Sequence, residues 1–161
     1  MKDTHMASSS PLLSVRHLRV EIPTRQGPLV ALDDVSFDIA RGEILGFVGE
    51  SGAGKSLTGM AVLGLLDAPA HVAAGQIVFD GQAIEGLPPA RMRELRGKRI
   101  AAVFQDPLLS LNPLLTVGDQ LIETLCTHLP MTAAEARERA IDWLRRVGIP
   151  SPAERVDAYP H

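Results

Sequence analysis

The chain contains the stretch Gly49-Glu50-Ser51-Gly52-Ala53-Gly54-Lys55-Ser56, which has the spacing G-x-x-x-x-G-K-S. Glycines let the backbone curl so that successive N–H groups point inward around a phosphate. A helix that begins near Lys55 would add the positive end of its dipole. The stretch therefore predicts a loop that binds the phosphates of a nucleotide. An ordinary glycine-rich turn is the alternative.

Two side chains of this loop carry the predicted chemistry. Lys55 is expected to reach the β- and γ-phosphates as a point charge, and the Ser56 hydroxyl to ligate Mg²⁺, which prefers hard oxygen ligands. Leu57, the next residue, is included in the predicted phosphate site. The full set of candidate binding residues in this loop is Gly49, Glu50, Ser51, Gly52, Ala53, Gly54, Lys55, Ser56 and Leu57.

The residues on either side of the loop favour the same interpretation. Residues 44–48 form a short, continuous apolar run, which is typical of a strand buried on both faces. From residue 55 to 66 the apolar positions recur at intervals of three and four, which predicts a helix. A strand, a glycine-rich loop and a helix in this order are the context that a phosphate loop needs.

Apolar periodicity predicts the other elements. An antiparallel pair of strands should precede the loop and turn near residues 23–28. Thr132 with Glu135 reads as a capping box at the start of a helix. The last residues, 150–161, look like a loop. The predicted strands are 13–22, 29–40, 76–79 and a second buried strand 100–104, and the predicted helices are 88–95, 117–128 and 132–147.

Composition limits the class of protein. Hydrophobic residues make up 45% of the 161, so the chain can bury a core, and the net charge of −3 disfavours nucleic acid as a partner. No stretch approaches the ~18 apolar residues that span a bilayer. The single cysteine, Cys126, cannot form an internal disulfide and is expected to be a small buried apolar side chain.

Longer blocks of sequence resemble the ATP-binding subunits of ABC transporters. The phosphate loop is preceded by Leu32-Asp33-Asp34-Val35-Ser36-Phe37 and by Arg41-Gly42-Glu43, and is followed by Val103-Phe104-Gln105-Asp106-Pro107. The continuation Leu108-Leu109-Ser110-Leu111-Asn112-Pro113, with the later Thr116-Val117-Gly118-Asp119-Gln120, is similar to the oligopeptide/dipeptide branch.

The resemblance implies roles for two residues outside the loop. Gln105 matches a glutamine that contacts Mg²⁺ and the attacking water, so it joins Lys55 as a candidate catalytic residue; a plain polar residue at a strand end is the alternative. Ile22 matches the aromatic residue that stacks on adenine. An aliphatic side chain loses the ring–ring contribution, about 0.5–1.5 kcal/mol. Residues 106–117 match the region that abuts the membrane-spanning partner, and a proline-containing surface loop is the alternative.

The resemblance also implies a setting. The cofactors would be ATP and Mg²⁺, and the partners would be membrane-spanning permease subunits and a second ATP-binding subunit, in a homo- or heterodimer. An extracytoplasmic solute-binding protein would act indirectly, and the subunit would lie peripherally on the cytoplasmic face of the cell membrane. In the family, a glycine-rich signature, a catalytic glutamate and a switch histidine follow a Tyr-Pro-His like Tyr159-Pro160-His161, so we expect a fragment that binds ATP and hydrolyses it negligibly.

The expected fold is α/β. It comprises a phosphate-loop (RecA-like) core with an antiparallel β-subdomain and the start of an α-helical subdomain, incomplete at the C-terminus. Residues 1–11 would be a disordered tail, 12–105 the β-subdomain and core, and 106–161 the start of the helical subdomain. Two alternatives stay open: another phosphate-loop enzyme, such as a small kinase, and a nucleotide-binding or interaction module without chemistry.

Overall fold

The computed structural model describes residues 10–104 and 110–161. The chain forms two compact units, Met1–Arg93 and Glu94–His161. The helix α2 (Pro89–Leu95) contains the boundary between them. The boundary predicted between residues 105 and 106 falls outside the described residues, as does most of the predicted tail, 1–11, and both stay predictions.

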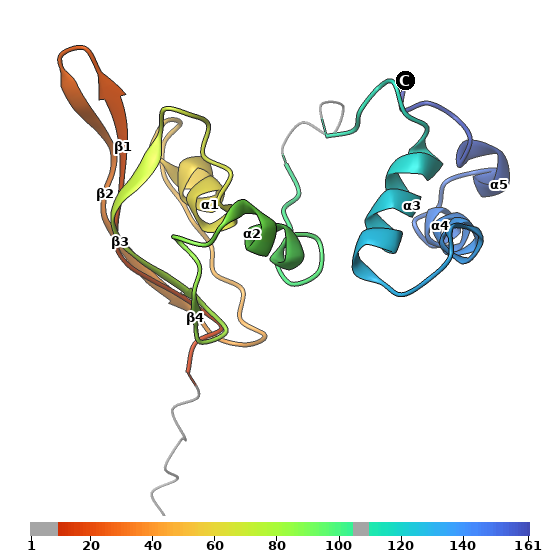
Figure 1. The fold of residues 1–161 in the computed structure, drawn as a ribbon, viewed down its shortest axis with the longest axis horizontal. Coiled ribbons are helices and arrows are strands. Elements are labelled where there is room, and N and C mark those ends of the chain that lie inside the picture. Colours follow the sequence, from red (N-terminus) through yellow and green to blue (C-terminus); the bar gives the residue numbers. More distant parts are fainter. Residues whose placement is uncertain (1–9, 105–109) are drawn as a thin grey trace, which may run out of the picture. The chain divides into compact units, whose positions relative to one another are not determined.

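The first unit is built on an antiparallel sheet with the strand order β2-β1-β3-β4 (Figure 1). The two long strands pair along their whole length and turn between Thr24 and Gly27, so the predicted pair of strands before the loop is confirmed. The strands are β1 (Leu13–Thr24), β2 (Gly27–Ile39), β3 (His71–Phe79) and β4 (Gln82–Ala83).

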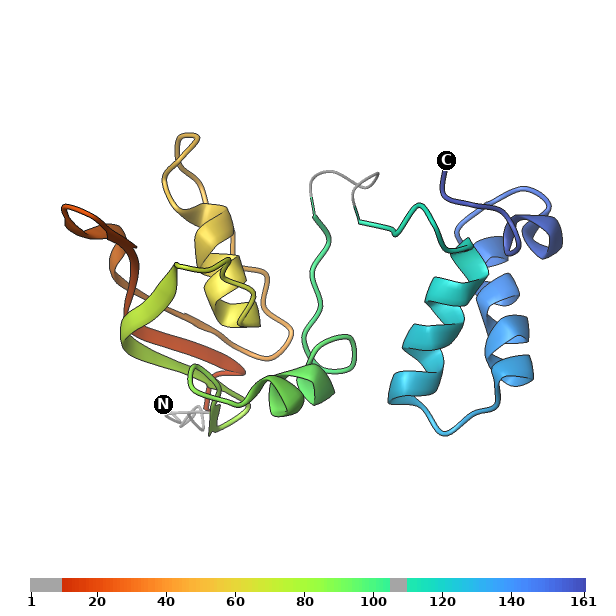
Figure 2. The same cartoon turned by 45° about the horizontal axis from the view of Figure 1, so that its top comes forward.

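The core of the first unit lies between this sheet and the helix α1 (Lys55–Leu63), which covers one face of the sheet (Figures 1 and 2). Val15, Leu18, Val20 and Ile77 are completely buried. Burial of such side chains contributes about 1.5–3 kcal/mol each. The helix ends three residues earlier than the predicted residue 66, because Gly64 adopts a left-handed conformation with φ 61°.

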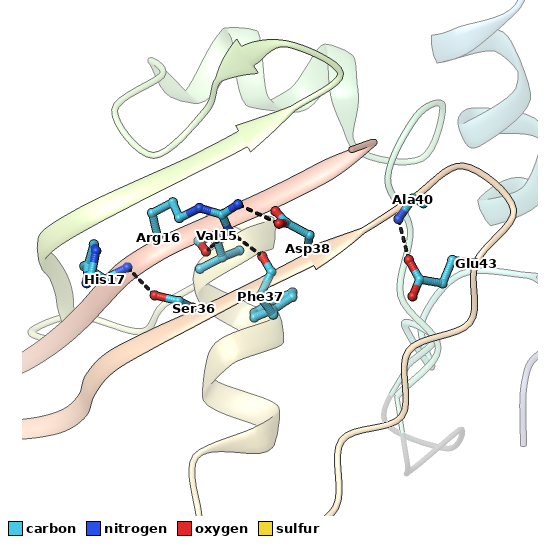
Figure 3. A network of polar contacts seen from close by, with 8 residues as sticks. All are labelled: Val15, Arg16, His17, Ser36, Phe37, Asp38, Ala40 and Glu43. Carbon is cyan, nitrogen blue, oxygen red and sulfur yellow. Dashed lines mark hydrogen bonds and ion pairs between the residues drawn. The ribbon is translucent and has the colours of Figure 1, made fainter. Parts of the chain in front are cut away.

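A distortion crosses the middle of the sheet. His17 in β1 and Asp34 in β2 have positive φ angles of 49° and 54°, and Gly75 in β3 has φ 96°. The pairing register shifts at this place on both sides of β1. The His17 N–H donates to the Ser36 Oγ at 2.8 Å (Figure 3), and His17 Nδ1 lies 2.6 Å from Asp34 Oδ1. These contacts hold a β-bulge that increases the local twist of the sheet.

Cross-strand ion pairs lie on the exposed side of β1 and β2. Arg16 donates to Asp38 at 2.6 Å (Figure 3), and this hydrogen bond lowers the pKa of the Asp38 carboxyl. Arg19 bonds Asp33 across the strands at 2.9 Å and Glu21 within β1 at 2.8 Å. Exposed pairs of this kind contribute little stability, but they mark which face of the sheet is in contact with solvent.

The predicted buried strand at residues 44–48 is wrong for this structure. These residues form no strand, and Ile44 and Val48 are 96% and 97% exposed. Phe47 alone makes a ring contact, edge-on to Phe37 with centroids 4.9 Å apart. A strand buried on both faces needs neighbours that pair with its backbone; among the described residues, none pairs with this run.

The second predicted buried strand, residues 100–104, is also wrong. Ile100 makes an isolated bridge with Arg96, and residues 101–104 have no regular structure. Val103 is fully exposed. An apolar run of this kind is buried only when it lies between neighbouring strands. Among the described residues no such strands flank it, so the predicted burial is not found.

The second unit is a helical hairpin with a short third helix. The helix α3 (Val117–His128) has the predicted bounds, and α4 (Ala133–Arg146) begins at the predicted capping box. The Thr132 N–H donates to Glu135 Oε2 at 2.7 Å, which lowers the pKa of Glu135. Thr116 and Asp119 form a second capping box, on α3, so in both helices the N–H groups of the N-cap residue and of the third helical residue are satisfied by side chains of the box.

Two predictions for this unit are corrected. Residues 150–161 contain a short helix, α5 (Pro152–Arg155). The segment after it is held on α3, since Gly118 N donates to Val156 O at 2.7 Å and Val117 N to Ala158 O at 2.9 Å. Cys126 is exposed, because it follows the buried Leu125 by one residue and a helix turns about 100° per residue.

Candidate phosphate-binding site

The glycine-rich loop leads directly into the first turn of α1 (Figure 2). Gly54 is the N-cap residue, with φ 82°, and no side chain caps the helix. Its first turn contains no acidic residue. Among the described residues, no group accepts a hydrogen bond from the N–H groups of Lys55, Ser56 and Leu57. In α3 and α4 the N-cap threonine side chain accepts a hydrogen bond from the N–H of Asp119 or Glu135, whereas the equivalent Leu57 N–H of α1 has no such acceptor.

Lys55 holds the loop from within. Its Nζ donates to the carbonyl oxygens of Gly49 and Glu50, both at 2.7 Å. The loop is therefore closed around the ammonium group at its base. An ammonium has three N–H donors, so one donor remains for an anion. The positive charge thus lies beside the helix N-terminus. The ammonium group and the helix dipole both favour an anion there.

The loop is seated on the sheet through Gly54. A Cβ atom on this glycine would lie 2.4 Å from Leu32 Cδ2, which is far inside van der Waals contact. On the helix side, Thr58 is buried and bonds the Gly54 carbonyl twice, through its N–H at 2.8 Å and its hydroxyl at 3.0 Å. The left-handed backbone favours glycine at this position, and a Cβ atom would also force the buried Leu32 side chain to shift.

The outer part of the loop is open. Gly52 has φ 85° with nothing within 4 Å of its hypothetical Cβ, and a Cβ on Gly49 would lie 3.3 Å from Ala53 Cβ. The Ala53 N–H donates to Glu50 O at 3.2 Å. Glu50, Ser51 and Ala53 are exposed. The side chains at these positions therefore do not fill the space inside the curved loop.

A divalent cation fits this site only as an ion shared with a ligand. Ser56 is exposed, and its hydroxyl makes no hydrogen bond within the part of the chain that the structure describes. In the same residues, no cluster of three or more His, Cys, Asp or Glu side chains could hold a metal. Mg²⁺ is usually bound by few protein ligands, with phosphates and water completing its shell. The exposed Ser56 hydroxyl could be one of these few protein ligands.

The other predicted site residues have different outcomes. Ile22 lies in β1, half-buried, and pairs with Leu29 across the hairpin. Gln105 and Asp106 lie outside the described residues, so the role of Gln105 stays a prediction. Sequence reasoning missed Leu32 and Thr58, which fix the loop to the sheet and to the helix. Leu32 is apolar but lies out of phase with the alternation of Val35, Phe37 and Ile39, and nothing in the sequence singles out Thr58.

The chain belongs to the ABC transporter family, whose sequence profile matches residues 32–161. This match begins at the residue against which Gly54 lies and includes the whole glycine-rich loop.

Curated relatives support the same membership. The dipeptide transport ATP-binding protein DppD of Escherichia coli is 43% identical over 150 residues, which cover 93% of this chain and 46% of that protein. The peptidoglycan transport ATP-binding protein YejF of Agrobacterium fabrum is 46% identical over 162 residues, covering 100% of this chain and 29% of its own length. The chain thus spans half the length or less of these relatives.

A solved structure shows the fold. The dimeric ATP-binding cassette MJ0796, in a post-hydrolysis state bound to ADP and Pi, is similar with a TM-score of 0.77 over 92% of this chain and 61% of that one. The sequence identity is 23%, so the likeness establishes the α/β fold of an ABC cassette and no more. In the described residues, no helix has the length and apolarity needed to cross a membrane.

Proposed function

We propose that this chain is the nucleotide-binding part of an ATP-binding subunit of an ABC importer for peptides or similar small solutes. One observation carries the proposal: the first turn of α1 leaves the N–H groups of Lys55, Ser56 and Leu57 without acceptors, beside the Lys55 ammonium. Family membership decides against a small kinase. The names of the relatives, which describe dipeptide and peptidoglycan transport, support the solute class.

ATP would be held through its phosphates. The backbone of residues 49–54 and the first turn of α1 would donate hydrogen bonds, and Lys55 would neutralise charge on the β- and γ-phosphates. Ser56 would contribute its hydroxyl to Mg²⁺, which neutralises charge on the phosphates when bound. Ile22 would cover one face of the base. Gln105 would help to place Mg²⁺ and water, a role supported only by its position in the family motif.

In the whole protein, ATP binding and hydrolysis would drive uptake. The subunit would act with membrane-spanning permease subunits and a second ATP-binding subunit, and with a solute-binding protein indirectly. Such a subunit would lie peripherally on the cytoplasmic face of the membrane. Phosphoryl transfer to water depends on positioning and charge stabilisation. Lys55 would supply charge and Gln105 would help to place water, but we assign no carboxylate of this chain to activating that water, so the chain alone should hydrolyse ATP negligibly.

Titration of the chain with ATP and ADP, with and without Mg²⁺, tests the phosphate site. Lys55→Ala should weaken binding about tenfold to a hundredfold, since it removes a hydrogen-bonded charge from the loop. Lys98→Ala is the matched control, because it removes the same charge from the second unit. Equal binding by both variants and the unchanged chain would contradict the proposal.

A turnover assay tests the expected lack of hydrolysis. Phosphate release by the purified chain should not exceed that of the Lys55→Ala variant. Sustained release that disappears in the variant would show that the chain positions water by itself.

A further inference from the structure

We propose that the second unit binds a small apolar carboxylate, in a recess between the turn that carries Lys98 and the helices α3 and α4. The two helices lie side by side (Figures 1 and 2). The recess has a volume of about 270 Å³. Every residue that lines it belongs to the unit Glu94–His161, so the proposal is independent of phosphate binding by the first unit.

The wall of the recess is mainly apolar. Leu125 of α3, Leu129 directly after this helix and Trp143 of α4 form it. Ala136 and Ala140 precede Trp143 on the same side of α4 and are completely buried. Trp143 itself is 38% exposed. Sites for small molecules are mostly apolar, with a few polar groups that fix orientation. The uncovered part of the indole can therefore contact an apolar ligand.

The polar groups around the recess are mainly hydrogen-bond donors. The Lys98 ammonium has three donors, the His128 ring has at least one, and the Trp143 indole only donates. In the part of the chain that the structure describes, none of these three groups has a hydrogen-bond acceptor or a carboxylate partner. The Thr124 hydroxyl donates to Gln120 O at 2.9 Å. None of the residues that line the recess is acidic, so these donors favour an anion.

The turn that carries Lys98 is held in place. Gly97 N donates to Ile100 O at 2.9 Å, and Ile100 N donates back to Leu95 O at 3.1 Å. Gly97 also lies against α3, because a Cβ atom on it would come within 2.6 Å of His128 Nε2. The ammonium of Lys98 therefore extends from a closed turn beside the imidazole, and ordering it around a ligand costs only the freedom of its own side chain.

The combination of an apolar wall and few charges selects the class of ligand. Lys98 supplies one full positive charge at the recess, and Arg139 adds another 5.5 Å from the centre of the Trp143 ring. A single carboxylate on an apolar body satisfies both the donors and the wall. A ligand with several charges would place some of them against leucine and indole, where the loss of hydration is unfavourable.

The first experiment uses the fluorescence of Trp143, the one tryptophan of the chain. Titration with octanoate should change it saturably, and octanamide, which lacks the charge, should bind about threefold to tenfold more weakly. Lys98→Gln should lower the octanoate affinity to that of octanamide. Arg155→Gln removes the same charge from α5 and should have no effect. Equal binding of octanoate and octanamide, or no saturable change, would overturn the proposal.

The second experiment tests the place of binding. Thr124 and Thr127 are both exposed on α3, but only Thr124 lines the recess. Thr124→Phe fills the recess and should weaken octanoate binding about tenfold or more, whereas Thr127→Phe should leave it unchanged. Both variants keep Trp143, so the same fluorescence signal compares them. Equal affinity in the two variants would show that octanoate binds elsewhere and would contradict the proposal.

Discussion

Gly54 lies so close to Leu32 that a Cβ atom on the glycine would come within 2.4 Å of Leu32 Cδ2. The contact joins the loop to β2, and Thr58 bonds the carbonyl of the same glycine from α1. The phosphate loop is therefore attached on both sides at a single residue. A loop attached in this way can keep its N–H groups directed at a ligand without reorganising.

Gly54→Ala should therefore weaken ATP binding about tenfold or more. The new methyl group would collide with Leu32, and the left-handed backbone would add strain of about 1–2 kcal/mol. Because both effects act on the loop, the free energy of unfolding should also fall. Titration with ATP and urea unfolding of the same preparation measure the two losses.

Gly52→Ala separates these effects. Gly52 has φ 85°, close to the φ 82° of Gly54, but nothing lies within 4 Å of its hypothetical Cβ. The loss of ATP affinity in Gly52→Ala should therefore come from backbone strain alone. If the two variants lose equal affinity, the seat on Leu32 has no part in forming the loop.

Gly75→Ala should destabilise the first unit by about 3 kcal/mol. A Cβ atom at this position would lie 2.5 Å from His17 O and 2.7 Å from Arg16 O, and backbone atoms cannot yield as a flexible side chain can. Strain at φ 96° adds to this clash. Gly81→Ala, at φ 79° in open space, should cost only about 1–2 kcal/mol. Urea unfolding compares the two variants; equal costs would show that the bulge can relax.

Substitutions at two valines test whether the apolar run before the loop is exposed. Val48→Ser should change the free energy of unfolding by less than about 0.5 kcal/mol, because Val48 already faces solvent. Val20→Ala, in the core, should cost about 2 kcal/mol or more. A large loss from Val48→Ser would mean that residues 44–48 are buried in solution.

Acid should weaken the second unit through two carboxylates. Hydrogen bonds from Thr132 lower the pKa of Glu135, and those from Arg137 lower the pKa of Asp157. Their contributions are complete above the unfolded pKa values, about 4.3 and 3.9, and are lost as the pH falls through the lowered folded values. Stability measured between pH 6 and about pH 2 should fall less steeply in Glu135→Gln, whereas Glu123→Gln, outside both capping boxes, should follow the unchanged chain.

Local signals predicted much of the fold. The paired strands before the loop, the helix after it and the bounds of α3 follow from periodicity and from residues that act on their neighbours. The capping box of Thr132 and Glu135 is an example, since its bonds span three residues. The family match also agrees with the resemblance found in the motifs. Such features depend mainly on contacts within short segments, so the sequence of those segments is enough to predict them.

The two apolar runs at 44–48 and 100–104 show where local signals fail. Their composition indicates burial between strands, but a strand exists only where a neighbour pairs with its backbone. The prediction that Cys126 is buried was wrong for a related reason. The type of a residue does not say whether it lies on the side of the helix that packs against a partner. In each case the missing information is the identity of the neighbour.

The sequence by itself determined that residues 49–56 curve into a loop before a helix, because glycine spacing and helix signals act through the backbone of those residues. Tertiary structure alone decided where that loop is fixed. Leu32 and Thr58 reach Gly54 from β2 and from α1, and Leu29 joins Ile22 across the hairpin through a register shift. These contacts join residues distant in sequence, and their free energy depends on atoms brought within contact distance only by the folded sheet.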